Sequence, residues 1–303
     1  MLIKRTSCFK DPEKDIPLFY RWAEKIMNLN GRSYHRKLID TSLGKTLVWE
    51  WQNSENPQHT LVIFPGFRTS PLFWDLDKGF DHFGIPLKVF LIETNGQPNP
   101  SDGNTPDIKS NDYGHWANEV LNQLSITKTY IAGASFGGLV CMKLCITNPE
   151  KIQGAFLLNP GCLQTVSLHP VHFYYLILPA IRPTRKNILA FLHKAVFAKP
   201  VHQLSPEAEN LLVEYEEFAI KHYKDRTMKP YFMKDELKKV SVPTWLLEGT
   251  HDTLFPYQKS IANAKKYIST LREVKVFEHV GHGIETYAPA MEYVGKVMRD
   301  EYE

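Results

Sequence analysis

One serine of the chain lies in a pattern suited to nucleophilic chemistry. The segment 133–138 (GASFGG) directly follows a strand-like apolar run at 129–132 and precedes a helical apolar run at 139–146. A G-x-S-x-G pattern between a strand and a helix forms a sharp turn that exposes the serine, and its glycines avoid collisions with neighbouring backbone. The helix N-terminus also favours a developing negative charge. We predict that Ser135 is a nucleophile; the alternative is a glycine-rich turn with an incidental serine.

A serine hydroxyl is a weak nucleophile at neutral pH and needs a general base. His282 follows the last strand-like run and is the one histidine among 12 that has a glycine on both sides. We predict that it is the base and that it lies within about 2.6–3.2 Å of Ser135, or slightly beyond. His279 is the nearest alternative, although it still belongs to the strand or its edge. The structural alternative for His282 is a surface-loop histidine.

An acid is needed to hold the histidine in the correct tautomer and to stabilise the imidazolium that forms. Where the nucleophilic serine lies at such a strand-to-helix turn, the acid follows the serine in the sequence and precedes the histidine. Asp252 lies in the loop 248–256, which follows the apolar run 244–247. We predict Asp252 as the acid. Glu248 lies closer to the strand and is the second candidate, and His251 is interpreted as a loop residue.

Backbone amides should stabilise the oxyanion that forms when the serine attacks a carbonyl group. One donor is expected to be the N–H of Phe136, the residue after the nucleophile. The other is expected in the loop after the run 60–64, where Pro65-Gly66-Phe67 makes the Phe67 N–H the best candidate. The alternative is that Pro65-Gly66 is only a turn.

The elements around these groups predict an α/β fold. Short apolar runs alternate with amphipathic stretches such as 112–124 and 257–268, which indicates a parallel sheet covered by helices on both faces. Reactive groups of such sheets lie at the carboxyl ends of the strands, and all four predicted groups follow a strand. A helix at about 12–29 begins the chain. The expected strands are 34–40, 45–51, 60–64, 87–92, 129–132, 155–158, 244–247 and 274–277.

One long interval lacks any strand signal. Residues 162–240 contain helical patterns, for instance at 206–223, and hold twelve Lys or Arg against eight Asp or Glu. We predict that this interval is a helical cap or lid inserted between two core segments, 1–161 and 241–303. Its charge of +4 (12 − 8) leaves room for an anionic substrate. Its aromatic residues, ten in all and including Phe173 and Tyr174, indicate a partly apolar one.

The chain from about residue 60 to its end resembles the α/β-hydrolase superfamily, specifically its capped, carboxylesterase-like serine hydrolases. The segments that carry the resemblance are PGFRTSPLFW (65–74), GASFGG (133–138), EGTHDTLFP (248–256) and VGHG (280–283). Gly249, Asp252 and Pro256 match the family's G-x-x-D-x-x-x-P segment, which supplies the acid of the catalytic triad.

The resemblance implies an eight-stranded, mostly parallel sheet with a helical cap after the sixth strand. It also implies a two-step acyl-enzyme mechanism without a cofactor. Many relatives have His-Gly where this chain has Pro65-Gly66, and histidine where it has Ala134. Neither position performs the chemistry, but both differences weaken any transfer of substrate identity.

Composition bounds the remaining possibilities. A net charge of +3 over 303 residues gives little support to nucleic-acid binding. The four cysteines have neither zinc-like spacing nor a disulfide framework, so no metal site is expected. The sequence contains no run of about 18 apolar residues, so no membrane span is expected. The first residues lack the apolar part of a secretory signal. We expect a cytoplasmic monomer or homodimer.

The expected function is hydrolysis of a small ester-like substrate. Gly66 and Arg68, beside the oxyanion loop, and Phe173 and Tyr174, in the insertion, are predicted to contact that substrate. A thioesterase, lactonase, C–C hydrolase, amidase or acyltransferase would use the same serine machinery. A ligand receptor without catalysis remains the alternative from another class.

Overall fold

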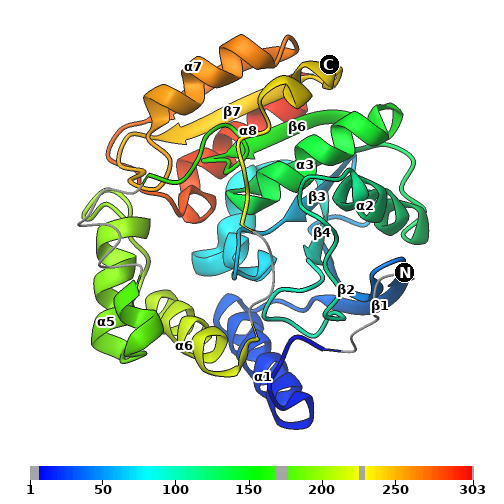
Figure 1. The fold of residues 1–303 in the computed structure, drawn as a ribbon. Coiled ribbons are helices and arrows are strands. Elements are labelled where there is room, and N and C mark those ends of the chain that lie inside the picture. The colour runs from blue at the N-terminus through cyan, green and yellow to red at the C-terminus, as the bar shows by residue number, and fades with distance from the viewer. Residues whose placement is uncertain (1–6, 168–176, 225–228, 302–303) are drawn as a thin grey trace.

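The computed structural model describes residues 7–167, 177–224 and 229–301. Within them, eight strands form one sheet in the order β1-β2-β4-β3-β5-β6-β7-β8. The pairs β1–β2 and β2–β4 are antiparallel, and all other neighbours are parallel (Figure 1). The predicted α/β class, with an eight-stranded and mostly parallel sheet, is confirmed. The strands are β1 (His35–Thr41), β2 (Gly44–Gln52), β3 (His59–Phe64), β4 (Leu87–Glu93), β5 (Thr129–Ala134), β6 (Ile152–Leu158), β7 (Thr244–Gly249) and β8 (Leu271–Phe277).

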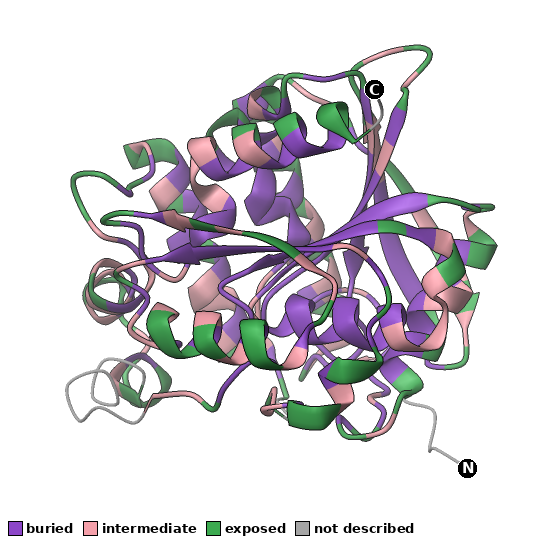
Figure 2. Ribbon diagram, turned by 90° about the horizontal axis from the view of Figure 1, so that it is seen from above, coloured by how far each residue is buried: buried purple, intermediate pink, exposed green. Residues whose placement is uncertain are grey.

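Helices cover both faces of this sheet, as Figure 2 shows for the buried strands between two helical layers. Five α-helices are α1 (Pro12–Asn30), α2 (Asp112–Gln123), α3 (Phe136–Thr147), α7 (Tyr257–Tyr267) and α8 (Ala288–Asp300). Between β6 and β7 lie α5 (Arg185–Phe191), the π-helix η3 (Leu192–Val196), α6 (Pro206–His222) and η4 (Lys234–Lys239). The remaining short helices are η1 (Pro71–Phe83), η2 (Pro149–Lys151) and η5 (Ile284–Thr286).

The apolar strands form two cores because successive side chains of a strand point to opposite faces. Leu61 and Ile63 of β3 pack with α1, η1 and α8, whereas Val62 and Phe64 pack with α2, α3 and α7. Burial on both faces explains why such strands appear in the sequence as uninterrupted apolar runs. Because β3 to β8 run parallel, their carboxyl ends lie at the same end of the sheet.

The segment between β6 and β7 packs on the N-terminal helix through α6, and Figure 1 shows α6 between α1 and α5. Trp22 of α1 donates through Nε1 to the carbonyl oxygen of Leu211 at 2.8 Å. Lys25 and Glu214 form an exposed ion pair at 2.7 Å. In the described parts of the chain, no helix has both the length and the apolar character needed to span a membrane.

Candidate active site

Ser135 occupies the corner between β5 and α3, where its backbone has φ 50° and ψ −111°. A positive φ is strained for a residue with a side chain, and such strain is typical of functional sites. The two glycines of the pattern permit the corner. A Cβ on Gly133 would overlap the backbone of Gly137, and one on Gly137 would overlap the carbonyl oxygen of Phe64. The strand–turn–helix context predicted for Ser135 is therefore present.

Hydrogen bonds from the end of β6 hold this corner. The Ser135 N–H donates to the carbonyl oxygen of Leu158 at 3.0 Å. Its carbonyl oxygen accepts from Gly138 N at 3.1 Å and from Gly161 N at 2.8 Å. Ser135 is partly exposed, so its hydroxyl can be reached while its backbone is fixed.

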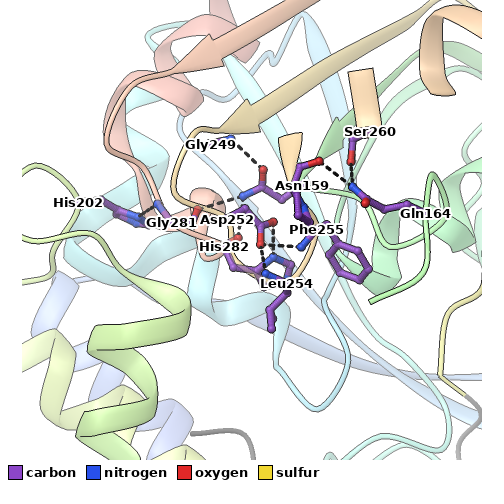
Figure 3. A network of polar contacts seen from close by, with 11 residues as sticks. Asn159, Gln164, His202, Gly249, Asp252, Leu254, Phe255, Ser260, Gly281 and His282 are labelled. Atoms are coloured by element: carbon purple, nitrogen blue, oxygen red, sulfur yellow. Dashed lines mark hydrogen bonds and ion pairs between the residues drawn. The ribbon is translucent and has the colours of Figure 1, made fainter. Parts of the chain in front are cut away.

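His282 and Asp252 form an ion pair, with Nδ1 of the ring 2.7 Å from Oδ2 of the carboxylate (Figure 3). The other oxygen, Oδ1, accepts from Leu254 N at 2.8 Å and from Phe255 N at 3.0 Å. The Asp252 side chain is fully buried and that of His282 is 14% exposed. One carboxylate oxygen thus anchors the acid in its own loop, and the other orients the imidazole.

Two carboxylates surround the imidazole and influence its protonation. Burial lowers the pKa of His282, but the charge of Asp252 and its hydrogen bond raise it, and the charge of Glu285 raises it further. The net result is a pKa above the ordinary value for histidine. Burial also raises the pKa of Glu285, while the charge of His282 lowers it. This environment favours the imidazolium form, which a general base must reach during the reaction.

The end of β6 contacts both the serine corner and the histidine loop. Leu158 accepts the Ser135 N–H, and the next residue, Asn159, donates through Nδ2 to the carbonyl oxygen of His282 at 3.0 Å. No hydrogen bond joins the Ser135 hydroxyl to His282 in the described part of the chain. Such hydrogen bonds are often long before substrate binds and tighten in the reacting complex.

The loop after β3 lies against the serine corner. A Cβ on Gly66 would lie 3.6 Å from the Ser135 Cβ, and the rings of Phe67 and Phe136 have centroids 6.4 Å apart. Neither the Phe67 N–H nor the Phe136 N–H donates to another residue in the described segments. The Phe67 and Phe136 N–H groups remain the predicted oxyanion donors.

Polar side chains near the end of β4 hold this loop. Arg68, at φ 59°, donates its N–H to Oε1 of Gln97 at 2.9 Å. Ser70 donates its hydroxyl to Oε1 of Glu93 at 2.6 Å. Burial raises the pKa of Glu93, the hydrogen bonds from Ser70 and Trp49 partly offset this rise, and the resulting pKa is about 8. The raised pKa favours the neutral form of the carboxyl group that supports this loop.

The Arg68 side chain lies against the segment between β6 and β7. Its guanidinium carbon is 5.5 Å from the ring centroid of Phe67 and 5.9 Å from that of Tyr223. Burial raises the pKa of Glu216, the charge of Arg68 partly offsets this rise, and the resulting pKa is about 7. Phe173 and Tyr174, the other two predicted substrate contacts, lie outside the described residues.

A family model described as serine aminopeptidase, S33, matches residues 104–286 of the chain. The chain belongs to this family. It is similar to the uncharacterized carboxylesterase nap of Bacillus subtilis (strain 168), with 24% identity over 264 residues, 86% of this chain and 84% of that protein. Carboxylesterase YbfK of the same strain is 21% identical and covers 92% of this chain and 91% of its own length.

A solved structure, that of naproxen esterase (carboxylesterase NP) from Bacillus subtilis, has the same fold. It superimposes with a TM-score of 0.77 at 21% identity and covers 96% of this chain and 99% of its own. The resemblance to the α/β-hydrolase superfamily, stated above on four sequence segments, is confirmed. The S33 family chain therefore has the fold on which a corner serine, an acid and a loop histidine can form a triad.

The rival residues lie elsewhere in this S33 family member. Glu248 is fully buried in β7, and no hydrogen bond joins it to His282 in the residues described. Burial raises its pKa well above the ordinary value, and the charge of Asp252 raises it further. His251 and His279 lie together, with ring centroids 4.9 Å apart, and both residues are exposed. The geometry favours Asp252 and His282.

Sequence reasoning missed two residues that hold the histidine loop of this S33 family member. Asn159 accepts from Gly249 N at 2.9 Å and donates to the carbonyl oxygens of Gly281 and His282, each at 3.0 Å (Figure 3). It directly follows β6, so the rule that functional groups follow parallel strands could have found it. The second residue, His202, lies between η3 and α6, where no sequence pattern marks it.

Proposed function

We propose that this chain is a serine carboxylesterase in which Ser135 is the nucleophile, His282 the general base and Asp252 the orienting acid. The observation that carries the proposal is the attachment of the strained Ser135 corner and the His282–Asp252 pair to adjacent residues at the end of β6. A surface histidine or an incidental turn serine has no need of such an arrangement. The relatives named carboxylesterases support an ester as the substrate.

In the first step, His282 Nε2 takes the proton of the Ser135 hydroxyl as Oγ attacks the ester carbonyl carbon. The carbonyl oxygen becomes an oxyanion and accepts hydrogen bonds from the Phe67 and Phe136 N–H groups. When the intermediate collapses, the bond to the alcohol oxygen breaks, and His282 gives its proton to that oxygen. The alcohol leaves and the acyl group stays on Ser135.

In the second step, water replaces the alcohol. His282 accepts a proton from the water as its oxygen attacks the acyl carbon, and the same two amides bind the second oxyanion. Collapse breaks the bond to Ser135 Oγ, which regains a proton from His282, and the carboxylic acid is released. Asp252 remains ionised throughout and stabilises the imidazolium in both steps.

Residues 162–240 form a cap over this site in the proposed enzyme, and residues 1–161 and 241–303 form the core. Support comes from α6, which packs on α1, and from Val196, whose carbonyl oxygen accepts from Gly283 N at 3.0 Å. Gly66 and Arg68 line the substrate side of the oxyanion loop. The favoured substrate is a small ester with an apolar part, because residues 162–240 contain ten aromatic residues.

An amide is the second candidate substrate, because the family model carries the description of a serine aminopeptidase. The two activities separate in a paired assay of p-nitrophenyl butyrate and alanine p-nitroanilide with the same purified protein. We expect kcat/KM for the ester to exceed that for the amide. A preference for the anilide would overturn the carboxylesterase proposal and leave the serine mechanism intact.

Replacement of Ser135 by alanine is the central test. Ser135→Ala is expected to lower kcat for p-nitrophenyl butyrate by about 10⁴-fold or more, because no other group can form the acyl-enzyme. Labelling by a fluorophosphonate probe should disappear with it. Ser33→Ala, at an exposed serine that precedes β1, is the matched control and should keep full activity. Activity that survives in purified Ser135→Ala would refute the proposed mechanism.

A further inference from the structure

The segment between β6 and β7 binds the backbone on both sides of His282. His202, which is 1% exposed, accepts the Gly281 N–H through Nδ1 at 3.1 Å. The carbonyl oxygen of Val196 accepts the Gly283 N–H at 3.0 Å. Both amides that flank His282 therefore donate to residues of the insertion rather than to the sheet.

The same contacts explain the two glycines beside His282. Neither has a positive φ, so the loop does not need glycine for its own conformation. A Cβ on Gly281 would overlap the carbonyl oxygen of Val196, and one on Gly283 would lie 2.7 Å from Val196 Cγ1. The glycines serve the close approach of the insertion, which a loop that only returned the imidazole to the serine would not require.

The hydrogen bonds of His202 define its tautomer. Because Nδ1 accepts the Gly281 N–H, the proton of the neutral ring is on Nε2, which lies 3.0 Å from the Thr286 hydroxyl oxygen. Thr286 in turn donates its hydroxyl to the carbonyl oxygen of Gly283 at 2.9 Å. Burial lowers the pKa of His202 to about 4, so the ring is neutral at neutral pH and keeps its acceptor.

Neighbouring rings hold the imidazole in this orientation. The ring centroid of His202 lies 5.0 Å from that of Phe197 and 5.5 Å from that of Tyr287, and both pairs are edge to face. A flip of the ring would place the Cδ2–H group against the Gly281 N–H and would lose the hydrogen bonds of both Nδ1 and Nε2. His202 is thus a fixed acceptor on one side of His282, while Asn159 binds the loop carbonyls from the core side.

We propose that His202 is a positioning residue: through its hydrogen bond to the Gly281 N–H, the insertion sets the position of the loop that carries His282. This inference rests on the proposed role of His282 as the general base. If His202 has this role, the rate of the reaction at Ser135 depends on the position of the insertion relative to the loop that carries His282. A buried histidine that only packed would affect stability and leave the chemistry of the folded enzyme unchanged.

The test compares His202→Phe with His202→Asn. Phenylalanine keeps an aromatic ring beside Phe197 and Tyr287 but cannot accept the Gly281 N–H, whereas asparagine offers an amide oxygen near the position of Nδ1. We expect His202→Phe to lower kcat for p-nitrophenyl butyrate about 10- to 100-fold with KM within two-fold, because small displacements of a catalytic group are costly. His202→Asn should recover most of the loss.

His193→Phe is the matched control, because His193 also belongs to the insertion but contacts Glu209 at 2.6 Å instead of the loop. It should keep the kcat of the unmodified protein. If His202→Phe does not fold, Thr286→Val replaces it, since loss of the Nε2 partner releases the ring. That variant should lower kcat about five-fold at unchanged KM. Unchanged kcat in the folded variant, with only a lower Tm, would overturn the inference.

Fluorophosphonate labelling of Ser135 distinguishes a failure of the proposed function from a failure of the proposed role of His202. Absence of labelling and of esterase activity in the unmodified protein contradicts the proposed function itself. Labelling of His202→Phe at the rate of the unmodified protein contradicts only the role of His202. Slow labelling of His202→Phe and rapid labelling of His202→Asn and His193→Phe support both.

Discussion

Two short segments carry the proposed reaction, the corner around Ser135 and the loop around His282, and the contacts that hold them differ in origin. In the part of the chain that the structure describes, residues of the core hold the corner. Its amide binds Leu158 at the end of β6, and the fit of Gly137 against Phe64 allows no added side chain. Because these contacts come from neighbouring strands of one sheet, the sheet itself holds the backbone of the proposed nucleophile.

The loop is held from two sides instead. Asn159 of the core binds its carbonyl oxygens, while His202 and Val196 of the insertion bind its amides. The base therefore takes its position from two parts of the chain that are far apart in sequence. This difference predicts that substitutions at the loop can change kcat while the backbone contacts of the Ser135 corner stay intact. Three substitutions in and around the loop test this prediction.

The largest effect is expected at the acid. Asp252→Asn keeps an oxygen for the amides of Leu254 and Phe255 but places an N–H₂ group against Nδ1, which favours the wrong tautomer of His282. We expect kcat for p-nitrophenyl butyrate to fall by about 10⁴-fold with little change in Tm. Asp235→Asn, at an exposed acid paired with Lys238 at 2.7 Å, should be silent. A loss below ten-fold would show that another group orients the base.

An intermediate effect is expected on the core side of the loop. Asn159→Ala leaves the buried amide of Gly249 and two loop carbonyls without their partner, so unfolding should become easier by about 1–3 kcal/mol. Because the histidine loop loses its core anchor while the Ser135 corner keeps Leu158, kcat should also fall about ten-fold. Chemical denaturation and steady-state kinetics on one preparation measure both. Loss of stability at full kcat would mean that the insertion alone positions the loop.

The same two segments differ in how far the sequence predicts them. The corner is a local pattern: 133–138 contains the predicted nucleophile and the glycines, and the strand-like and helical runs directly adjoin it at 129–132 and 139–146. The strand-end rule adds Asp252 and His282, because parallel strands bring distant loops to one edge. Their pairing at 2.7 Å is consistent with that reasoning.

Contacts between distant segments could not be predicted in this way. No periodicity relates His202 to the loop beside Gly281, and the glycines alone do not say what approaches them. The edge strand β8 shows a related limit. Only 274–277 is expected from apolar character, whereas β8 spans Leu271–Phe277, because its first half contains two consecutive charged and exposed residues, Arg272 and Glu273. Burial on one side only removes the uninterrupted apolar signal.

The smallest effect is expected from the second carboxylate near the base. His282 must be neutral to accept the serine proton, so kcat/KM should rise with pH through its pKa, which lies above the ordinary histidine value. Asp252 and Glu285 both stabilise the imidazolium. Glu285→Gln removes one negative charge, so the pKa of His282 should fall and the acidic limb of the profile should move to lower pH. We expect a shift of less than about one pH unit, because a full pKa unit would require a difference of about 1.4 kcal/mol in how Glu285 interacts with the two protonation states of His282.

The pH dependence of kcat/KM for p-nitrophenyl butyrate measures this shift, and Glu278→Gln is the control. A shift to higher pH would contradict a charge effect of Glu285 on the loop histidine.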